Sequence, residues 1–210
     1  MDVLGRRFSP AIGSFNKRHT LTLLKMLKQK YQWLFAAVLV TAAFFLASAL
    51  WIPVKAKVAQ FLLENAWQRT LAGEIGAKPW PWADTSPVGV LEVATLGIRL
   101  IVLSGTSGRN LAFGPTLHSP PEENDKILSG HRDTHFRFLE SVKIGEILRV
   151  TTVHGALEYR ISWLEVIDSD VQELVLEPDV SRLTLTTCYP FDSPSAGGSL
   201  RYVVTAIQVS

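Results

Sequence analysis

The chain has 210 residues and a mass of 23.3 kDa, which allows one domain of ordinary size with a small appendage and excludes two full enzyme domains. Hydrophobic residues make up 47% and charged residues 19% of the sequence, which excludes a disordered chain and indicates that part of the protein lies in lipid. The net charge is +2, and the single cysteine excludes an internal disulfide and a zinc cluster built on cysteines.

The first 54 residues combine a basic segment with an apolar one. Residues 1–30 carry seven Lys or Arg against one acid, so this segment has a net charge of +6 and the rest of the chain −4. Residues 31–54 contain no charged side chain. As a helix these 24 residues would extend about 36 Å, which exceeds the roughly 30 Å hydrocarbon core of a bilayer. We therefore predict a transmembrane helix over 31–54.

The distribution of charge and aromatic residues predicts how this helix is oriented. Tyr31, Trp33 and Trp51 suit the two membrane interfaces, and the basic excess before the helix predicts that residues 1–30 form a cytoplasmic tail. Everything after the helix is then extracytoplasmic. We do not expect nucleic acid as the partner of the basic tail, because the tail directly precedes the apolar run. A cleaved signal peptide is the alternative, although the run is longer than a usual signal core.

Residues 55–87 are expected to connect the membrane with the folded domain. Apolar residues recur at near-helical spacing as far as Gly73, which predicts an amphipathic helix that lies on the bilayer or stands as a stalk. Residues 77–87 contain three prolines, which oppose helix. The folded domain is therefore expected over 88–210.

The remaining sequence consists of short β-type segments separated by turn residues. Val153–Gly155 predicts a hairpin turn, and short helical turns are expected within 111–115 and 135–141. About 120 residues with seven or eight strands and no long helix fit an all-β closed barrel or a sandwich better than an α/β sheet. The seven segments that predict strands are 88–94, 98–103, 126–129, 147–152, 156–167, 182–187 and 200–209.

The single cysteine, Cys188, directly follows the strand predicted over 182–187. Side chains alternate along a strand, so Cys188 shares a face with Thr184 and Thr186, while the leucines between them point to the other face. A buried structural cysteine is the common alternative, but catalytic groups favour the end of a strand before a loop. We interpret Cys188 as a candidate nucleophile, which needs a proton acceptor or a positive neighbour at neutral pH.

Among the histidines, His131 is the favoured proton acceptor. Ser129 and Gly130 precede it and leave room for another part of the chain to approach, and Asp133 is placed to orient the imidazole. The candidates without such a context are His118, His135 and His154.

A zinc site at His131 and His135 is not expected. The zinc motif H-E-x-x-H requires a glutamate after its first histidine, and Arg132 stands there.

Arg201 is the candidate for stabilising negative charge. Attack of a thiolate on a carbonyl creates an oxyanion, and a guanidinium is always positively charged. Arg201 lies near the start of the last predicted strand, thirteen residues after Cys188. If the loop 189–199 returns this strand antiparallel to the strand of the cysteine, Arg201 lies near the thiol. A surface ion pair is the alternative.

Taken together, the motif Thr-Leu-Thr-Thr-Cys over 184–188, the pair Gly130-His131 and Arg201 resemble the sortase family of cysteine transpeptidases. The resemblance extends from about Trp80 to Val209, and several segments are similar to sortases of Gram-negative marine proteobacteria, close to the class D type. It implies a closed eight-stranded β-barrel.

The resemblance also implies roles for individual residues. Cys188 would attack the Thr carbonyl of an LPXTG-like C-terminal sorting signal and form a thioester. His131 would act as general acid and base, and Arg201 would hold the substrate and stabilise the oxyanion. Thr186 would assist the oxyanion or bind the substrate Thr.

On this basis the chain is expected to be anchored in the cell inner membrane, with its catalytic domain in the periplasm and an amine acceptor that the sequence leaves unidentified. No cofactor is expected. Some sortases depend on a metal bound by acids before the last two strands, but we interpret the acids here as a solvated loop and expect no calcium site. These acids are Asp168, Asp170, Glu173 and Glu177.

Two alternatives stay open. A cysteine protease would use the same residues but release the thioester to water. A non-catalytic β-barrel adaptor on a membrane stalk would use Cys188 as a core residue.

Overall fold

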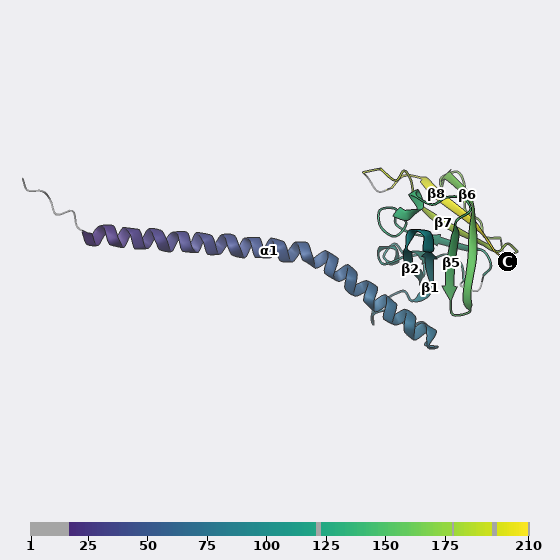
Figure 1. Ribbon diagram of the computed structural model, residues 1–210, viewed down its shortest axis with the longest axis horizontal. Helices are drawn as coiled ribbons and strands as arrows, with labels where there is room; N and C mark the ends of the chain where they lie inside the picture. The colour runs from purple at the N-terminus through teal and green to yellow at the C-terminus, as the bar shows by residue number, and fades with distance from the viewer. Residues whose placement is uncertain (1–16, 121–122, 178, 195–196, 210) are drawn as a thin grey trace, which may run out of the picture. The chain divides into compact units, whose positions relative to one another are not determined.

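The structure, a computed structural model, describes residues 17–120, 123–177, 179–194 and 197–209 (Figure 1). The predicted basic tail therefore lies outside the described residues as far as residue 16. The chain divides into two compact units, residues 1–54 and 55–210. One α-helix, α1 (Lys17–Leu71), continues from the first unit into the second. The helix begins before the span predicted over 31–54, and it continues beyond that span where an amphipathic helix is expected as far as Gly73.

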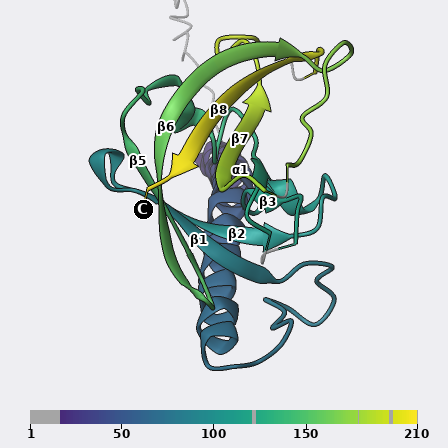
Figure 2. The same cartoon turned by 90° about the vertical axis from the view of Figure 1, so that its right-hand side faces the viewer.

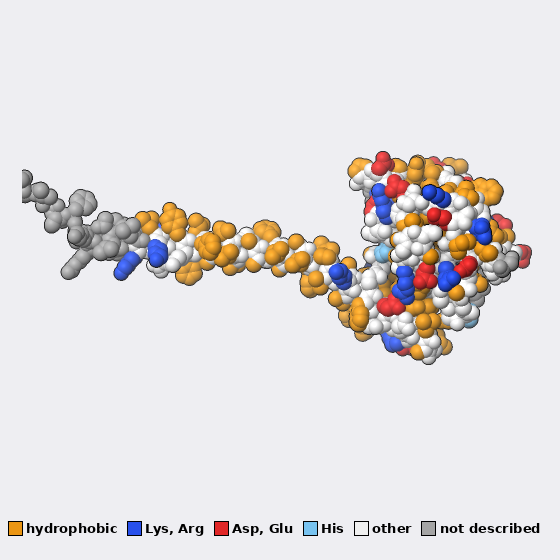
Figure 3. Space-filling view, viewed as in Figure 1, with side chains coloured by type: hydrophobic (Ala, Val, Ile, Leu, Met, Phe, Trp, Pro, Cys, Tyr) orange, Lys and Arg blue, Asp and Glu red, His pale blue; other side chains and the backbone are white. Residues whose placement is uncertain are grey.

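Between residues 31 and 54, α1 carries no charged side chain on any side of the helix. Large hydrophobic side chains such as Phe35, Leu46 and Trp51 are more than half exposed. Figure 3 shows hydrophobic side chains along the surface of this helix. A helix that is apolar on every side requires an apolar environment, which is either a protein core or lipid. The stretch that begins at Lys25 is long and apolar enough to cross a membrane, and none of its most apolar window is buried. It is a candidate membrane span.

The second unit contains a closed β-barrel, which confirms the all-β prediction. The strands are β1 (Pro87–Val93), β2 (Ile98–Ser104), β3 (Thr116–Leu117), β4 (Lys126–Ser129), β5 (Ile147–Thr152), β6 (Gly155–Asp168), β7 (Arg182–Cys188) and β8 (Leu200–Gln208). Their order around the barrel is β1-β2-β3-β4-β7-β8-β6-β5. Short 3₁₀ helices are η1 (Ala94–Leu96), η2 (Asn110–Ala112) and η3 (Arg137–Glu140).

The sequence pattern located every strand except β3. This strand has two residues, which is too short for any alternation to appear. The pattern also extended the first strand to residue 94, where the chain instead turns into η1 and reverses at Gly97, whose φ is +63°. The expected hairpin turn at residues 153 and 154 joins β5 to β6, and two of the 3₁₀ helices overlap the expected helical turns.

Two kinds of strand pairing matter for the arrangement of the site. Strands β4 and β7 pair in parallel, whereas β7 and β8 pair antiparallel. Figure 2 shows β6, β8 and β7 next to one another in the barrel wall. Because parallel strands run in the same direction, the carboxyl ends of β4 and β7 lie at the same edge.

The barrel interior is filled by alternate residues of the strands. On β7, Leu183 and Leu185 are fully buried in the main hydrophobic core, as the alternation predicts. The threonines between them face the outside of the barrel wall and yet are also buried, since Thr184 is 4% and Thr186 9% exposed. The outer face of β7 is therefore covered by other parts of the chain.

A second, smaller core joins α1 to the barrel wall. Leu63 and Trp67 pack with Val90 of β1 and with Ile101 and Leu103 of β2. These strands are buried on both faces, which explains why the sequence of β1 is almost continuously apolar.

Polar contacts support the same packing. Glu64 of α1 bonds Arg99 of β2 at 2.7 Å, and this bond lowers the pKa of the Glu64 carboxyl. The segment that follows α1 also packs on the barrel, because Trp80 contacts the ring of Phe113 edge to face with 4.9 Å between ring centroids.

We expect the change Trp67→Ala to lower the free energy of unfolding of the second unit by about 3–5 kcal/mol, because it leaves a cavity between α1 and the barrel. The measurement is denaturant unfolding of the full chain in detergent micelles, followed by circular dichroism. The matched control is Phe61→Ala on the same helix, where the side chain is 65% exposed and a small effect is expected. Equal effects of the two changes would contradict the packing described.

Candidate active site

The ends of β4 and β7 bring the two favoured site residues to one edge of the barrel. The parallel register pairs Ser129 with Thr186, and the backbone N–H of Gly130 continues the ladder by donating to the carbonyl of Thr186 at 3.2 Å. If this register continues two residues beyond its last pair, His131 lies opposite Cys188. The two residues are 57 positions apart in sequence, and the common edge at which β4 and β7 end brings their segments together.

The antiparallel strand β8 brings the third residue to the same edge. Cys188 is the register partner of Arg201, as expected from a loop that reverses the chain between them. Arg201 therefore lies beside Cys188 on the β8 side, and on the other side the segment that follows β4 leads to His131. The thiol is free and half-buried, and His131 is exposed, so a substrate has access to both.

The guanidinium of Arg201 is held by the loop that leads into β8. It donates to the carbonyls of Gly198 at 2.8 Å and of Leu200 at 2.9 Å. The Ser199 hydroxyl, the backbone N–H of Asp170 and the charge of Arg201 together lower the pKa of Asp168. The carbonyl groups thus orient Arg201, and among the described residues no salt bridge joins its guanidinium to a carboxylate.

The segment that carries His131 is fixed by a buried contact. Thr187 donates its hydroxyl hydrogen to the carbonyl of Gly130 at 2.7 Å, and both residues are buried. The small residue before the histidine is also needed, because a Cβ at Gly130 would lie 2.7 Å from a ring carbon of Phe136. The sequence predicts a close approach at Gly130 but does not indicate which residue approaches. In the structure that residue is Phe136, an aromatic residue of the core.

Thr186 lies two residues before Cys188 on the same face of β7. Its hydroxyl oxygen is buried and has no hydrogen-bond partner within the part of the chain that the structure describes. Such a group normally has a partner, because an unpaired buried hydroxyl destabilises the fold. Thr186 is therefore a buried polar group whose hydroxyl has no partner in the described part of the chain, two positions before Cys188.

Comparison with known proteins supports this geometry. The family model described as the sortase domain matches residues 91–209, which is more than half of the chain. The chain belongs to the sortase family. Members of this family are cysteine transpeptidases, a chemistry that requires a cysteine nucleophile, and the chain has one cysteine, Cys188.

Two relatives illustrate the extent of the similarity. The chain is 33% identical over 127 residues to sortase D of Bacillus subtilis, and this match covers 58% of the chain and 64% of the relative. The chain therefore spans less than two thirds of that protein. The structure of sortase C2 from pilus island 1 of group B Streptococcus has a TM-score of 0.50 and 25% identity, covering 59% of this chain and 74% of the other.

The fold is also that of sortase C from Clostridium perfringens, solved with a C-terminal cell wall sorting motif. The two structures have a TM-score of 0.53 at 21% identity, over 74% of this chain and 90% of the other. The eight-stranded barrel of the second unit is thus the sortase barrel.

Asp133 is arranged differently from the expectation that it orients the imidazole. Its two carboxylate oxygens accept hydrogen bonds from Arg132, at 2.8 Å from Nε and 3.0 Å from Nη2. This bond is the main reason why the pKa of Asp133 is lowered, with smaller contributions from the charges of Arg137 and His131. Among the described residues, no hydrogen bond joins Asp133 to His131.

The other histidines occupy different surroundings. His135 lies close enough to His131 for their charges to interact, and burial together with that charge lowers the pKa of His135. His154 is exposed in the turn between β5 and β6, as expected. His118 is exposed beside β4, where its backbone N–H donates to the carbonyl of Ile127. We find no group of three or more His, Cys, Asp or Glu residues arranged to hold a metal ion in the described ranges.

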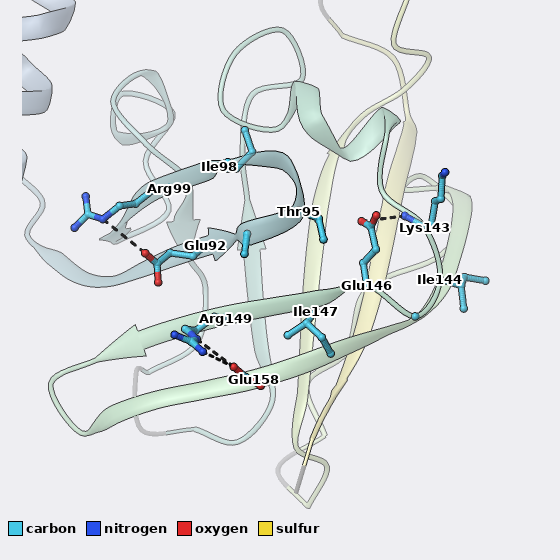
Figure 4. Close-up of a pocket in the computed structure, with 13 residues that line it drawn as sticks. Glu92, Thr95, Ile98, Arg99, Lys143, Ile144, Glu146, Ile147, Arg149 and Glu158 are labelled. Atoms are coloured by element: carbon cyan, nitrogen blue, oxygen red, sulfur yellow. Dashed lines mark hydrogen bonds and ion pairs between the residues drawn. The ribbon is translucent and has the colours of Figure 1, made fainter.

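A hollow of about 880 Å³ lies elsewhere on the barrel, over β1, β2, β5 and β6. Its charged side chains neutralise one another across the strands, because Arg99 pairs with Glu92 and Arg149 with Glu158 (Figure 4). None of the residues at the edge of β4 and β7 lines this hollow. We therefore assign the candidate chemistry to that edge.

The pair of threonines before the cysteine provides a matched test of the site. Thr187→Val leaves the buried carbonyl of Gly130 without its donor, so we expect the free energy of unfolding to fall by about 1–3 kcal/mol. Thr186→Val removes a hydroxyl that has no partner in the described structure, so a much smaller change is expected. Both are measured by denaturant unfolding. Indistinguishable stabilities would contradict the hydrogen bond at Gly130.

Proposed function

We propose that this chain is a membrane-anchored cysteine transpeptidase that cleaves an LPXTG-like C-terminal sorting signal and transfers the new carboxyl end to an amine. The observation that carries this proposal is the position of Cys188 between His131 and Arg201, at an edge that a substrate can reach. Support also comes from the Clostridium perfringens sortase C, whose structure contains a C-terminal cell wall sorting motif.

The first half of the proposed reaction forms a thioester. The Cys188 thiolate attacks the Thr carbonyl of the sorting signal, so that a carbon–sulfur bond forms and the carbonyl oxygen becomes negative. Arg201 stabilises this oxyanion, because its guanidinium keeps its charge throughout. When the intermediate collapses, the carbon–nitrogen bond breaks and His131 gives its proton to the departing amine.

The second half reverses these steps with a new amine. His131, now neutral, takes a proton from the incoming amine as that amine attacks the thioester carbonyl. The carbon–sulfur bond breaks and Cys188 leaves as the thiolate, which regenerates the site. The unpartnered hydroxyl of Thr186 is available to donate to the oxyanion or to the substrate Thr. Asp133 supports the site through its bond to Arg132.

The decisive experiment uses the full chain in detergent with peptides that carry LPXTG-like motifs. Mass spectrometry is expected to detect an acyl adduct on Cys188, the only cysteine in the chain. Cys188→Ala abolishes the adduct, and His131→Ala lowers kcat by about 10²–10⁴-fold. Arg201→Lys lowers kcat by about 10²–10³-fold, because an ammonium group lacks the planar arrangement of donors. The absence of any adduct on a thiol that reacts normally with iodoacetamide would overturn the proposal.

The same assay separates the transpeptidase from its two alternatives. With an added amine, a transpeptidase yields the amide product, whereas a cysteine protease yields only the free acid. If the protein is a non-catalytic adaptor, the wild type and Cys188→Ala bind the peptide equally well, and neither forms a product.

For the location, we propose a single-pass protein of the cell inner membrane with its catalytic domain on the periplasmic side. The support is the apolar span in α1 and the basic excess before it. Membrane lipid is then the partner of the first unit.

The single cysteine makes this topology testable. A membrane-impermeant maleimide is expected to label Cys188 in intact spheroplasts as strongly as after permeabilisation, and Cys188→Ala is the unlabelled control. Labelling only after permeabilisation would contradict the orientation. The intact mass of the membrane-bound protein is expected to include residues 1–54, whereas a cleaved signal peptide would remove them.

A further inference from the structure

Arginine side chains join the segment that follows β4 to the segment that follows β7 by hydrogen bonds. Arg132 directly follows His131, and its Nη1 donates to the carbonyl of Pro190 at 2.7 Å while its Nη2 donates to that of Ser193 at 2.9 Å. Arg137 adds a bond from Nη1 to the carbonyl of Phe191 at 2.6 Å. The carbonyls that accept these bonds belong to the segment that directly follows Cys188.

The Arg132 side chain is more deeply buried than an arginine in a surface ion pair needs to be. Its side chain is 5% exposed, whereas the carboxylate of Asp133, which it binds through two parallel hydrogen bonds, is 64% exposed. Donors from three nitrogens are engaged, with Nε and Nη2 on the carboxylate and Nη1 and Nη2 on the two carbonyls. Only the planar fork of a guanidinium supplies this combination, because a lysine has a single nitrogen.

Arg132 keeps its positive charge in this environment. The hydrogen bond to Asp133 raises the pKa of Arg132, burial opposes that rise, and the neighbouring charges, Cys188 among them, add to it.

We propose that Arg132 is a positioning residue that holds the segment after Cys188 against the segment of His131 and so keeps the thiol and the imidazole in reacting alignment. This inference rests on the proposed function only in its consequence for catalysis. The alignment itself is a property of the folded chain. Misplacement of reacting groups by about 1 Å can cost about 100-fold in rate, so a residue that acts only through their alignment can matter greatly.

Disulfide trapping tests the alignment without any substrate. His131→Cys adds a second cysteine next to Cys188, and neighbouring strands are about 4.8 Å apart, within the range in which a disulfide forms. The full chain in detergent is oxidised with copper phenanthroline, and the rate of disulfide formation is followed by intact mass. Adding Arg132→Lys to His131→Cys is expected to slow trapping at least about tenfold, because the two segments are no longer fastened.

The matched control is Arg149→Lys in the same background. Arg149 pairs with the exposed Glu158 on β6, and we expect trapping at the parent rate. Unchanged trapping with Arg132→Lys in a protein that still melts cooperatively would overturn the proposal. If Arg132→Lys does not fold, Asp133→Asn becomes the deciding variant. Asp133→Asn weakens the hydrogen bonds that the Arg132 guanidinium makes on its exposed side. Slower trapping therefore supports the proposal, and unchanged trapping overturns it.

The kinetic consequence is measured in the otherwise wild-type chain with the peptide that forms the acyl adduct. Arg132→Lys is expected to lower kcat about 100-fold while KM changes less than about threefold, because the residue aligns the reacting groups and does not bind substrate. A raised KM with an unchanged kcat would overturn the positioning role. If no peptide reacts, the proposed function fails, whereas the trapping result still decides the role of Arg132.

Discussion

The parallel pairing of β4 with β7 is the constraint on which the site depends. Parallel strands cannot be joined by a short turn, so the chain must pass through β5 and β6 before β7 returns beside β4. The same detour supplies strands that close the barrel. Because β4 and β7 run in one direction, each ends at the same edge, and His131 and Cys188 each lie two residues beyond the last paired positions.

Packing on both sides of the barrel wall stabilises the barrel that carries that edge. The interior is packed by alternate residues of every long strand, and part of the outside is covered by α1 through Trp67. Next to the site, Thr187 and Gly130 are tied by a buried hydrogen bond, and Phe136 occupies the space that a side chain at Gly130 would need. A rigid edge matters because aligned reacting groups lower the barrier only when they cannot drift apart.

Arginines serve three different purposes in this domain, and burial distinguishes them. Arg149 is exposed and pairs with Glu158 across neighbouring strands, an arrangement that contributes little to stability. Arg201 is held by loop carbonyls at the position paired with Cys188. Arg132 is buried and donates hydrogen bonds to the backbone of the segment after Cys188.

The sequence by itself determined the apolar helix and the all-β class, because both depend on local periodicity and composition. It predicted Cys188, His131 and Arg201, and the register of three strands then brought them to one edge. Only the tertiary structure decided the rest. The two-residue β3 exists because its neighbours pair with it, and Asp133 turns to Arg132 instead of His131 because the guanidinium is buried beside it. The role of Arg132 depends on backbone carbonyls about 60 residues away, and no local pattern records where a distant carbonyl points.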